Sequence, residues 1–252
     1  MTTVLETRAL RKAFGGIVAT NDVTFKLPAG ARHALIGPNG AGKTTFVNLL
    51  SGVLLPTSGS IFLNGQDVTE WSVRARSRAG LARTFQINQL FADLTPLQTI
   101  MIAINERENA ANSWFRSFGA RKGLVGEAVE LIESLNLADV IHSRVGSLAY
   151  GKQRLLEIAI ALAAKPSVLL LDEPAAGVPE SERDQILNVV AALPASVSLV
   201  LIEHDMDLVF RFAKTISVLV NGALFVEGSA EEIAKDPRVR QVYLGEEVIN
   251  HG

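Results

Sequence analysis

The chain has 252 residues, of which 48% are apolar, and its 24 basic and 26 acidic side chains give a formal net charge of −2. This apolar content is enough for a substantial core, while the near-neutral charge provides no overall field that would hold nucleic acid. The absence of cysteine excludes disulfides and thiolate metal sites. The N-terminal residues 1–11 lack the apolar run of a signal peptide, so we expect a globular cytoplasmic protein that does not bind nucleic acid.

Short segments of β type open the chain, before any long helical pattern. They cover Val4–Thr7, Val23–Leu27, Arg32–Ile36 and Ser60–Leu63. We expect them to form a small sheet that leads into the segment described next.

The segment Gly37-Pro-Asn-Gly-Ala-Gly-Lys-Thr44 lies between an apolar strand and a helical stretch at Thr45–Leu50. Its glycines permit the backbone conformations that expose consecutive N–H groups, and the start of the helix adds its positive dipole end. Lys43 supplies a mobile cation, and Thr44 offers a hydroxyl to Mg²⁺. The pattern predicts a loop that wraps the phosphates of ATP or GTP.

Two further segments carry unusual side chains before the middle of the chain. A basic cluster comprises Arg74, Arg76, Arg78 and Arg83. We expect it to be a solvated face, because the first three arginines do not share one helix face. Three aromatic residues, Trp114, Phe115 and Phe118, stand among polar residues, and packing on the core and contact with a partner both remain open for them.

From about Leu90 to Ala164 the β signals largely vanish, and afterwards strands and helices alternate. The helical spacing covers Gln98–Glu106, Gly126–Leu135 and Gln153–Ala163. The later strands are Val168–Asp172, Val197–Glu203, Thr215–Val220 and Ala223–Glu227, with helices at Glu180–Leu193, Met206–Phe212, Glu231–Lys235 and Arg238–Leu244. This order predicts an α/β core with parallel strands, interrupted by a helical insertion.

The run Val168–Asp172 is continuously apolar up to its last residue, and Glu173 follows it. Such a strand is buried on both faces, and its carboxyl end reaches the ligand crevice of a parallel sheet. Hydrolysis of a nucleotide needs a cation on the phosphates, a metal and a group that orients water. Lys43, Asp172 as a ligand of Mg²⁺ and Glu173 as the group that polarises water are the candidates for these roles.

Over essentially its whole length the chain resembles the ATP-binding subunits of ABC transporters. Leu148-Ala-Tyr-Gly-Lys-Gln-Arg154 stands where that family has its signature, Gln86 matches the Q-loop glutamine, His204 the switch histidine and Phe14 the aromatic residue that stacks on adenine. The resemblance implies one ABC ATPase domain over residues 1–252: an α/β P-loop NTPase core with an antiparallel β subdomain, in residues 1–89 and 165–252, and a helical signature subdomain in residues 90–164.

The resemblance also implies the site residues, with ATP and Mg²⁺ as cofactors. The nucleotide would contact Phe14, Gly37, Asn39, Gly40, Ala41, Gly42, Lys43, Thr44, Thr45, Gln86, Ala149 and Gly151. The catalytic residues would be Lys43, Glu173 and His204, and the metal ligands Thr44, Gln86 and Asp172.

Two such subunits in this family hold two ATP molecules between them, and hydrolysis moves a membrane partner. The expected partners are transmembrane permease subunits, a second ATP-binding subunit or another copy of this chain and, indirectly, a substrate-binding protein, with the chain on the inner face of the cell membrane. The strings Gly80–Gln86, Asp172–Gly177, Leu201–Met206 and Val242–Gly245 resemble the importers of branched-chain amino acids.

Several alternatives stay open. The ATPases of importers of urea or aromatic acids, and the ATPase of lipopolysaccharide extraction, have many of the same sequence strings. A soluble ABC protein is disfavoured, because the chain has one nucleotide loop and no heptad run. A module that binds ATP without turnover is disfavoured by Glu173 and His204.

The sequence departs from the family pattern at the signature, where Ala149 replaces the usual serine and Lys152 a glutamine. Losing a hydroxyl that bonds a charged phosphate costs on the order of 1.5 to 3 kcal/mol at that contact. Because the signature serves the ATP of the opposite subunit, we expect this chain to pair with a different ATPase subunit, which gives one intact and one weakened site. Ala175–Val178 also lacks the aspartate that is usual in the family's D-loop.

Overall fold

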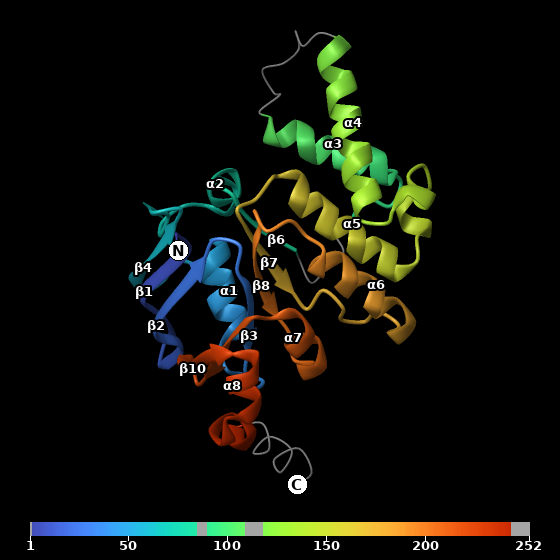
Figure 1. Cartoon of the computed structure of the whole chain (residues 1–252). Helices are drawn as coiled ribbons and strands as arrows, with labels where there is room; N and C mark the ends of the chain where they lie inside the picture. Colours follow the sequence, from blue (N-terminus) through green and yellow to red (C-terminus); the bar gives the residue numbers. More distant parts are fainter. Residues whose placement is uncertain (1, 85–89, 109–117, 243–252) are drawn as a thin grey trace. The chain divides into compact units, whose positions relative to one another are not determined.

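The computed structural model describes residues 2–84, 90–108 and 118–242, and residues 118–122 by their backbone alone (Figure 1). Gln86, Trp114 and Phe115 therefore lie outside the described residues. Over the described ranges, no helix is long and apolar enough to cross a bilayer. The chain divides into two compact units, the core unit (Met1–Leu81, Ser167–Glu173 and Pro194–Gly252) and the helical unit (Ala82–Pro166 and Pro174–Leu193).

Within the described ranges, the core unit contains two sheets, four helices with both ends described, and further helical residues at 237–242. Its strands are β1 (Thr3–Phe14), β2 (Ile17–Pro28), β3 (Arg32–Ile36), β4 (Ser58–Leu63), β5 (Gln66–Asp67), β7 (Val168–Asp172), β8 (Ser198–Ile202), β9 (Thr215–Val220) and β10 (Ala223–Ser229). Its helices are α1 (Lys43–Ser51), α2 (Val73–Arg78), α7 (Met206–Phe212) and α8 (Ala230–Lys235).

The first sheet is antiparallel, in the order β2-β1-β4-β5. The second has the order β10-β9-β3-β8-β7-β6, where β6 (Leu81–Arg83) begins as the chain leaves the core unit. Strand β3 pairs in parallel with β8 and β9, and β8 with β7, whereas β9 and β10 form an antiparallel hairpin. The prediction of an α/β core with parallel strands and an antiparallel subdomain is confirmed.

One expectation about these sheets is wrong. We expected Arg32–Ile36 to belong to the small opening sheet, but β3 lies inside the second sheet. The physical reason is its burial: four of its five residues, His33 to Ile36, are buried, and a strand covered on both faces needs neighbours and layers on either side. The opening sheet is instead dominated by the long hairpin of β1 and β2, each of 12 residues.

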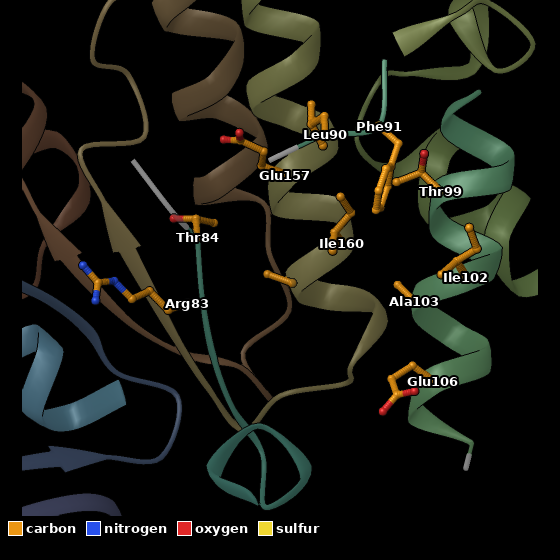
Figure 2. Close-up of a pocket in the computed structure, with 11 residues that line it drawn as sticks. Arg83, Thr84, Leu90, Phe91, Thr99, Ile102, Ala103, Glu106, Glu157 and Ile160 are labelled. Carbon is orange, nitrogen blue, oxygen red and sulfur yellow. The ribbon is translucent and has the colours of Figure 1, made fainter. Parts of the chain in front are cut away.

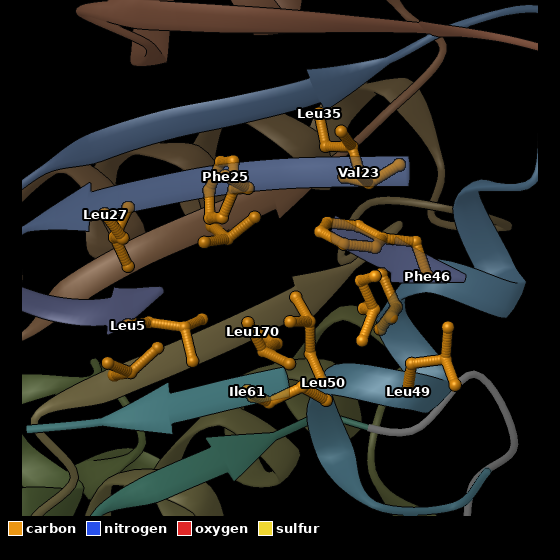
Figure 3. Close-up of a cluster of buried hydrophobic side chains, with 14 of the residues drawn as sticks. Leu5, Val23, Phe25, Leu27, Leu35, Phe46, Leu49, Leu50, Ile61 and Leu170 are labelled. Carbon is orange, nitrogen blue, oxygen red and sulfur yellow. The ribbon is translucent and has the colours of Figure 1, made fainter. Parts of the chain in front are cut away.

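The core of this unit is built around α1 (Figure 3). Phe46, Leu49 and Leu50 project from the helix among apolar side chains of β1, β2, β3, β4, β7 and β8. The ring of Phe46 meets Phe25 edge to face, with centroids 5.8 Å apart. Because α1 is buried in this way, the loop that precedes it is attached to a rigid element.

The helical unit contains α3 (Pro96–Arg107), α4 (Phe118–Ser134), α5 (Tyr150–Ala163) and α6 (Glu180–Ala191), with 3-10 turns at Ala138–Val140 and Val145–Ser147. Helix α3 starts at a capping box formed by Thr95 and Gln98, with Pro96 in its first turn. Contacts join α3 to α4 and α5, and α5 to α4 and α6. Helix α4 begins eight residues before the expected Gly126, and nothing is described of the side chain of Phe118.

Arg76 contradicts the expectation of a solvated basic face. Arg74 and Arg78 are exposed, but Arg76 is fully buried. Its guanidinium donates to the carbonyls of Leu49 and Leu50 in the last turn of α1, and also to those of Thr69 and Trp71. Helix α1 has no basic residue of its own in its last turn, so Arg76 supplies the cation that its carbonyl end favours. Burial lowers the pKa of Arg76 to about 10.

We expect Arg76→Met to lower the free energy of unfolding by about 3 kcal/mol, because it leaves several buried carbonyls without their donor. Urea unfolding followed by circular dichroism measures this loss. The matched control is Arg74→Met, on the exposed face of the same helix, which should change stability by less than about 0.5 kcal/mol. Equal stability of the two variants would contradict a structural role for Arg76.

Candidate functional site

The predicted loop connects β3 to α1, and its geometry depends on glycine. Gly37 has φ +151°, and a Cβ there would lie 2.2 Å from the carbonyl oxygen of Leu219; Gly42 has φ +96°, and its Cβ would lie 2.3 Å from that of Ala19. Gly42 is also the N-cap of α1, without a side-chain hydrogen bond and without an acidic residue in the first turn. Neither its N-cap residue nor an acidic residue of its first turn therefore caps the first amides of α1, which is the arrangement that binds phosphate.

Lys43, the first residue of α1, folds back over this loop. Its Nζ donates to the carbonyl oxygens of Gly37 and Pro38, the second at 2.9 Å. The loop's other predicted residues are exposed at Asn39, Gly40 and Thr44, half-buried at Thr45 and buried at Ala41. A movable cation thus lies beside the first amides of α1, and together they can neutralise a polyphosphate.

The strand register brings the predicted acidic residues to the same edge of the sheet as the loop. Strand β8 lies between β3 and β7, and Ile202 is opposite both Leu35 and Asp172. Because the strands are parallel, the residues that follow all three leave at one edge. The loop, Asp172, Glu173 and His204 are therefore collected there from three distant parts of the chain.

Glu173 and His204 are in contact at this edge. Glu173 Oε1 lies 3.5 Å from His204 Nδ1, and the two side chains are 29% and 67% exposed. The backbone of Glu173 has φ +46°, a left-handed conformation that is costly for a residue with a Cβ, and its N–H donates to the carbonyl of Ile202. This strained residue is the one predicted to polarise water.

Glu203 is a member of this cluster to which the sequence analysis gave no role. Its side chain is 3% exposed, Oε2 accepts a hydrogen bond from the backbone N–H of His204 at 3.3 Å, and the same oxygen lies 3.9 Å from His204 Nδ1. A carboxylate directly after an apolar strand was the available signal, as it was for Asp172. Glu203 therefore holds the backbone of His204 in place through this hydrogen bond.

Phe14 lies at the tip of the β1–β2 hairpin, and its side chain is exposed. The Nζ of Lys12 lies 5.1 Å from its ring centroid. The second strand of the hairpin borders the loop, because Asn21 donates to the carbonyl of Gly222, which in turn donates to that of Ala41. An exposed ring on a strand beside the loop has the chemistry to stack on a base.

The predicted signature residues belong to the helical unit. Ala149 is the N-cap of α5 and makes no side-chain hydrogen bond, and Gly151 is buried in the first turn. Lys152 turns away to Asp139, with Nζ at 2.9 Å from Oδ1, and donates to the carbonyl of Asn136. Gln86 lies outside the described residues, so its predicted metal contact stays a prediction.

The oxygen donors at the core site suit Mg²⁺. Thr44 is exposed next to Lys43, and Asp172 at the end of β7 is 4% exposed, so a hydroxyl and a carboxylate are available as hard ligands. Within the described ranges there is no group of three or more histidine and acidic side chains that could hold a metal by itself. A cation here would need further oxygens, such as those of a nucleotide's phosphates.

The helical unit carries a cavity of about 300 Å³ with a mostly apolar lining (Figure 2). Ile160 of α5 faces Ile102 and Ala103 of α3 across it. Two of the lining side chains, Phe91 and Ile102, are 66% and 53% exposed. Glu157 also lines the cavity, and burial raises the pKa of its carboxyl group, although Arg154 at 2.8 Å opposes this shift. The cavity therefore offers an open apolar surface.

Two family profiles match the chain. Residues 20–176 match the profile described as "ABC transporter", and residues 224–249 match one described as "Branched-chain amino acid ATP-binding cassette transporter". Together they cover the loop, the signature, the acidic pair and the C-terminal segment.

Curated relatives match nearly end to end. The high-affinity branched-chain amino acid transport ATP-binding protein BraF of Pseudomonas aeruginosa is 37% identical over 250 residues, covering 96% of this chain and 98% of the relative. LivG of Escherichia coli, with the same description, is 34% identical, covering 96% and 98%. A probable LivG of Archaeoglobus fulgidus is 35% identical, covering 96% and 95%.

The solved structures agree. The ADP conformation of MJ1267, an ATP-binding cassette of an ABC transporter, superposes with a TM-score of 0.84 at 29% identity, covering 97% of this chain and 100% of the other. A nucleotide-free ATP-binding cassette from an ABC transporter gives 0.82 at 27% identity, covering 96% and 98%. The predicted fold class is confirmed by these neighbours.

Proposed function

We infer the function of this chain from one premise: it belongs to the ABC transporter family and is an ATP-hydrolysing subunit of a transporter. We propose that the transporter imports branched-chain amino acids. The relatives described for that transport match the chain over 96% of its length, and the C-terminal profile bears the same description. The observation that carries the catalytic assignment is the contact of Glu173 with His204 at the sheet edge that also holds the loop.

The proposed reaction uses this chain's own groups at each position. The amides at the start of α1 and the ammonium of Lys43 bind the β- and γ-phosphates of ATP. Mg²⁺, held by Thr44, Asp172 and Gln86, would neutralise phosphate charge. Glu173 accepts a proton from a water molecule while the oxygen of that water attacks the γ-phosphorus. The bond between the γ-phosphorus and the bridging oxygen breaks, and ADP leaves. His204, placed by Glu203, contacts the γ-phosphate.

We propose that the complete site needs two subunits. Ala149 and Gly151 at the start of α5 would face ATP that is bound by the loop of the other subunit. Ala149 has no hydroxyl for that phosphate, which favours a pair with a second, different ATPase subunit. One site of the pair would then turn over more slowly than the other.

The cavity of the helical unit is the proposed contact for a transmembrane permease. Its exposed Phe91 and Ile102 would be covered by an apolar segment of the permease. In this proposal the subunit is peripheral, on the cytoplasmic face of the membrane, and a substrate-binding protein reaches it only through the permeases.

Purification of the tagged subunit from gently solubilised native membranes tests this function. We expect two multi-spanning permeases and a second ATPase subunit in the complex, with transport of leucine, isoleucine and valine in reconstituted vesicles. A single ATPase species with envelope-bridging proteins would instead indicate lipopolysaccharide extraction. Transport of urea or aromatic acids would reassign the cargo, and the absence of any membrane protein would refute the proposal.

A substitution in the wall of the cavity tests the permease contact directly. Ile102→Asp places a charge on the exposed wall and should reduce recovery of the permeases about tenfold or more. Val125→Asp, on α4 of the same unit and 38% exposed, is the matched control and should leave recovery unchanged. Equal recovery with both variants would place the permease contact elsewhere.

A further inference from the structure

The first turn of α5 obtains its cap from another helix. Its own N-cap residue, Ala149, makes no side-chain hydrogen bond. The N–H of Gly151 instead donates to Oε2 of Glu182 at 2.9 Å, 31 residues farther along the chain. Glu182 lies in the first turn of α6, so its carboxylate is near the positive ends of two helices at once.

Gly151 and Glu182 fit each other sterically. A Cβ at position 151 would lie 2.3 Å from Glu182 Oε2 and 3.2 Å from Glu182 Cβ. The first distance leaves no room for a Cβ while the carboxylate keeps its place, and the second is a tight contact. The absence of a Cβ at Gly151 therefore lets the carboxylate of Glu182 reach the backbone of the signature.

A second contact joins the same turn to the segment that follows Glu173. Gly177 has φ +72°, and a Cβ there would lie 3.5 Å from both Cε1 and Oη of Tyr150. The guanidinium carbon of Arg154 lies 5.1 Å from the centre of the Tyr150 ring. The start of α5 thus lies against the chain after the acidic pair: Gly151 is hydrogen-bonded to Glu182, and Tyr150 lies close to Gly177.

We propose that Glu182 is a positioning residue for ATP hydrolysis, and that it replaces the acceptor which the absent serine at position 149 would supply to the signature helix. The inference rests on the proposed function, in which the start of α5 faces ATP held by the other subunit: the N–H of Gly151 donates to Glu182, and the other first-turn amides are those that face phosphate. Those amides assist catalysis only if they are preorganised. Glu182 fixes their orientation from the first turn of α6, which follows the segment from Ala175 to Val178.

The test compares Glu182→Ala and Glu182→Gln in the assembled transporter. The alanine variant should lower kcat for ATP about tenfold, the size expected from loss of one helix cap, with KM unchanged within about twofold. The glutamine variant keeps an oxygen that accepts from Gly151 and should recover most of the rate. Glu180→Ala, exposed in the same turn of α6, is the matched control and should match the unaltered complex.

A second measurement separates positioning from simple stability. ATP affinity of the isolated subunit should be the same for Glu182→Ala and the unaltered chain, because the subunit's own loop site is in the core unit, while the unfolding midpoint should fall by no more than the loss of one helix cap explains. A parallel loss of affinity, midpoint and kcat would overturn the proposal, as would an unchanged kcat or a glutamine variant as slow as alanine. An unaltered complex without ATPase activity would refute the proposed function itself.

Discussion

Replacing Lys43 by alanine is expected to weaken ATP binding to the isolated subunit more than about a hundredfold. The loop amides remain in the variant, but the cation that would pair with the β- and γ-phosphates is lost, and charge-assisted bonds to phosphate are among the strongest polar contacts in proteins. The fold should persist, because the variant loses only local bonds from Nζ to the carbonyls of Gly37 and Pro38. The apolar core around α1 is unchanged.

Isothermal titration with Mg²⁺-ATP measures this loss, and circular dichroism checks the fold. Lys235→Ala is the matched control, because this lysine is 72% exposed and pairs with Glu231 on α8. Its ATP affinity should be that of the unaltered chain. An unchanged affinity in Lys43→Ala would mean that the loop does not bind phosphate.

The second large effect concerns Glu173→Gln, which should lower kcat of the assembled transporter about 10² to 10⁴-fold while ATP affinity stays within about threefold. Glutamine has nearly the same shape and can still approach His204, but it cannot accept the proton of the attacking water. With ATP bound and hydrolysis blocked, the two ATPase subunits should remain associated.

Single-turnover hydrolysis and size-exclusion chromatography with ATP measure the two parts of this prediction. Glu130→Gln, an exposed position on α4, is the matched control and should hydrolyse ATP normally. Normal turnover by Glu173→Gln would assign the general base to another group. Glu203, whose carboxylate lies 3.9 Å from His204 Nδ1, would be the candidate. Loss of ATP binding would show that Glu173 supports the loop instead of the chemistry.

The sequence by itself determined the elements whose signals are local. Strands Arg32–Ile36, Val168–Asp172 and Thr215–Val220 and helix Met206–Phe212 have the bounds that their apolar patterns predict. The loop was readable because its glycines and Lys43 are contiguous, so that backbone freedom and charge are encoded within eight residues. The order of the motifs along the chain was enough to indicate the ABC family.

Only the tertiary structure decided which distant residues meet. Arg76 looks like a surface residue in the sequence, but its guanidinium closes the end of α1. Glu173 reaches His204, and Glu182 caps α5, because parallel strands and packed helices bring their ends together. These contacts depend on register and packing across many residues, and no local periodicity contains that information.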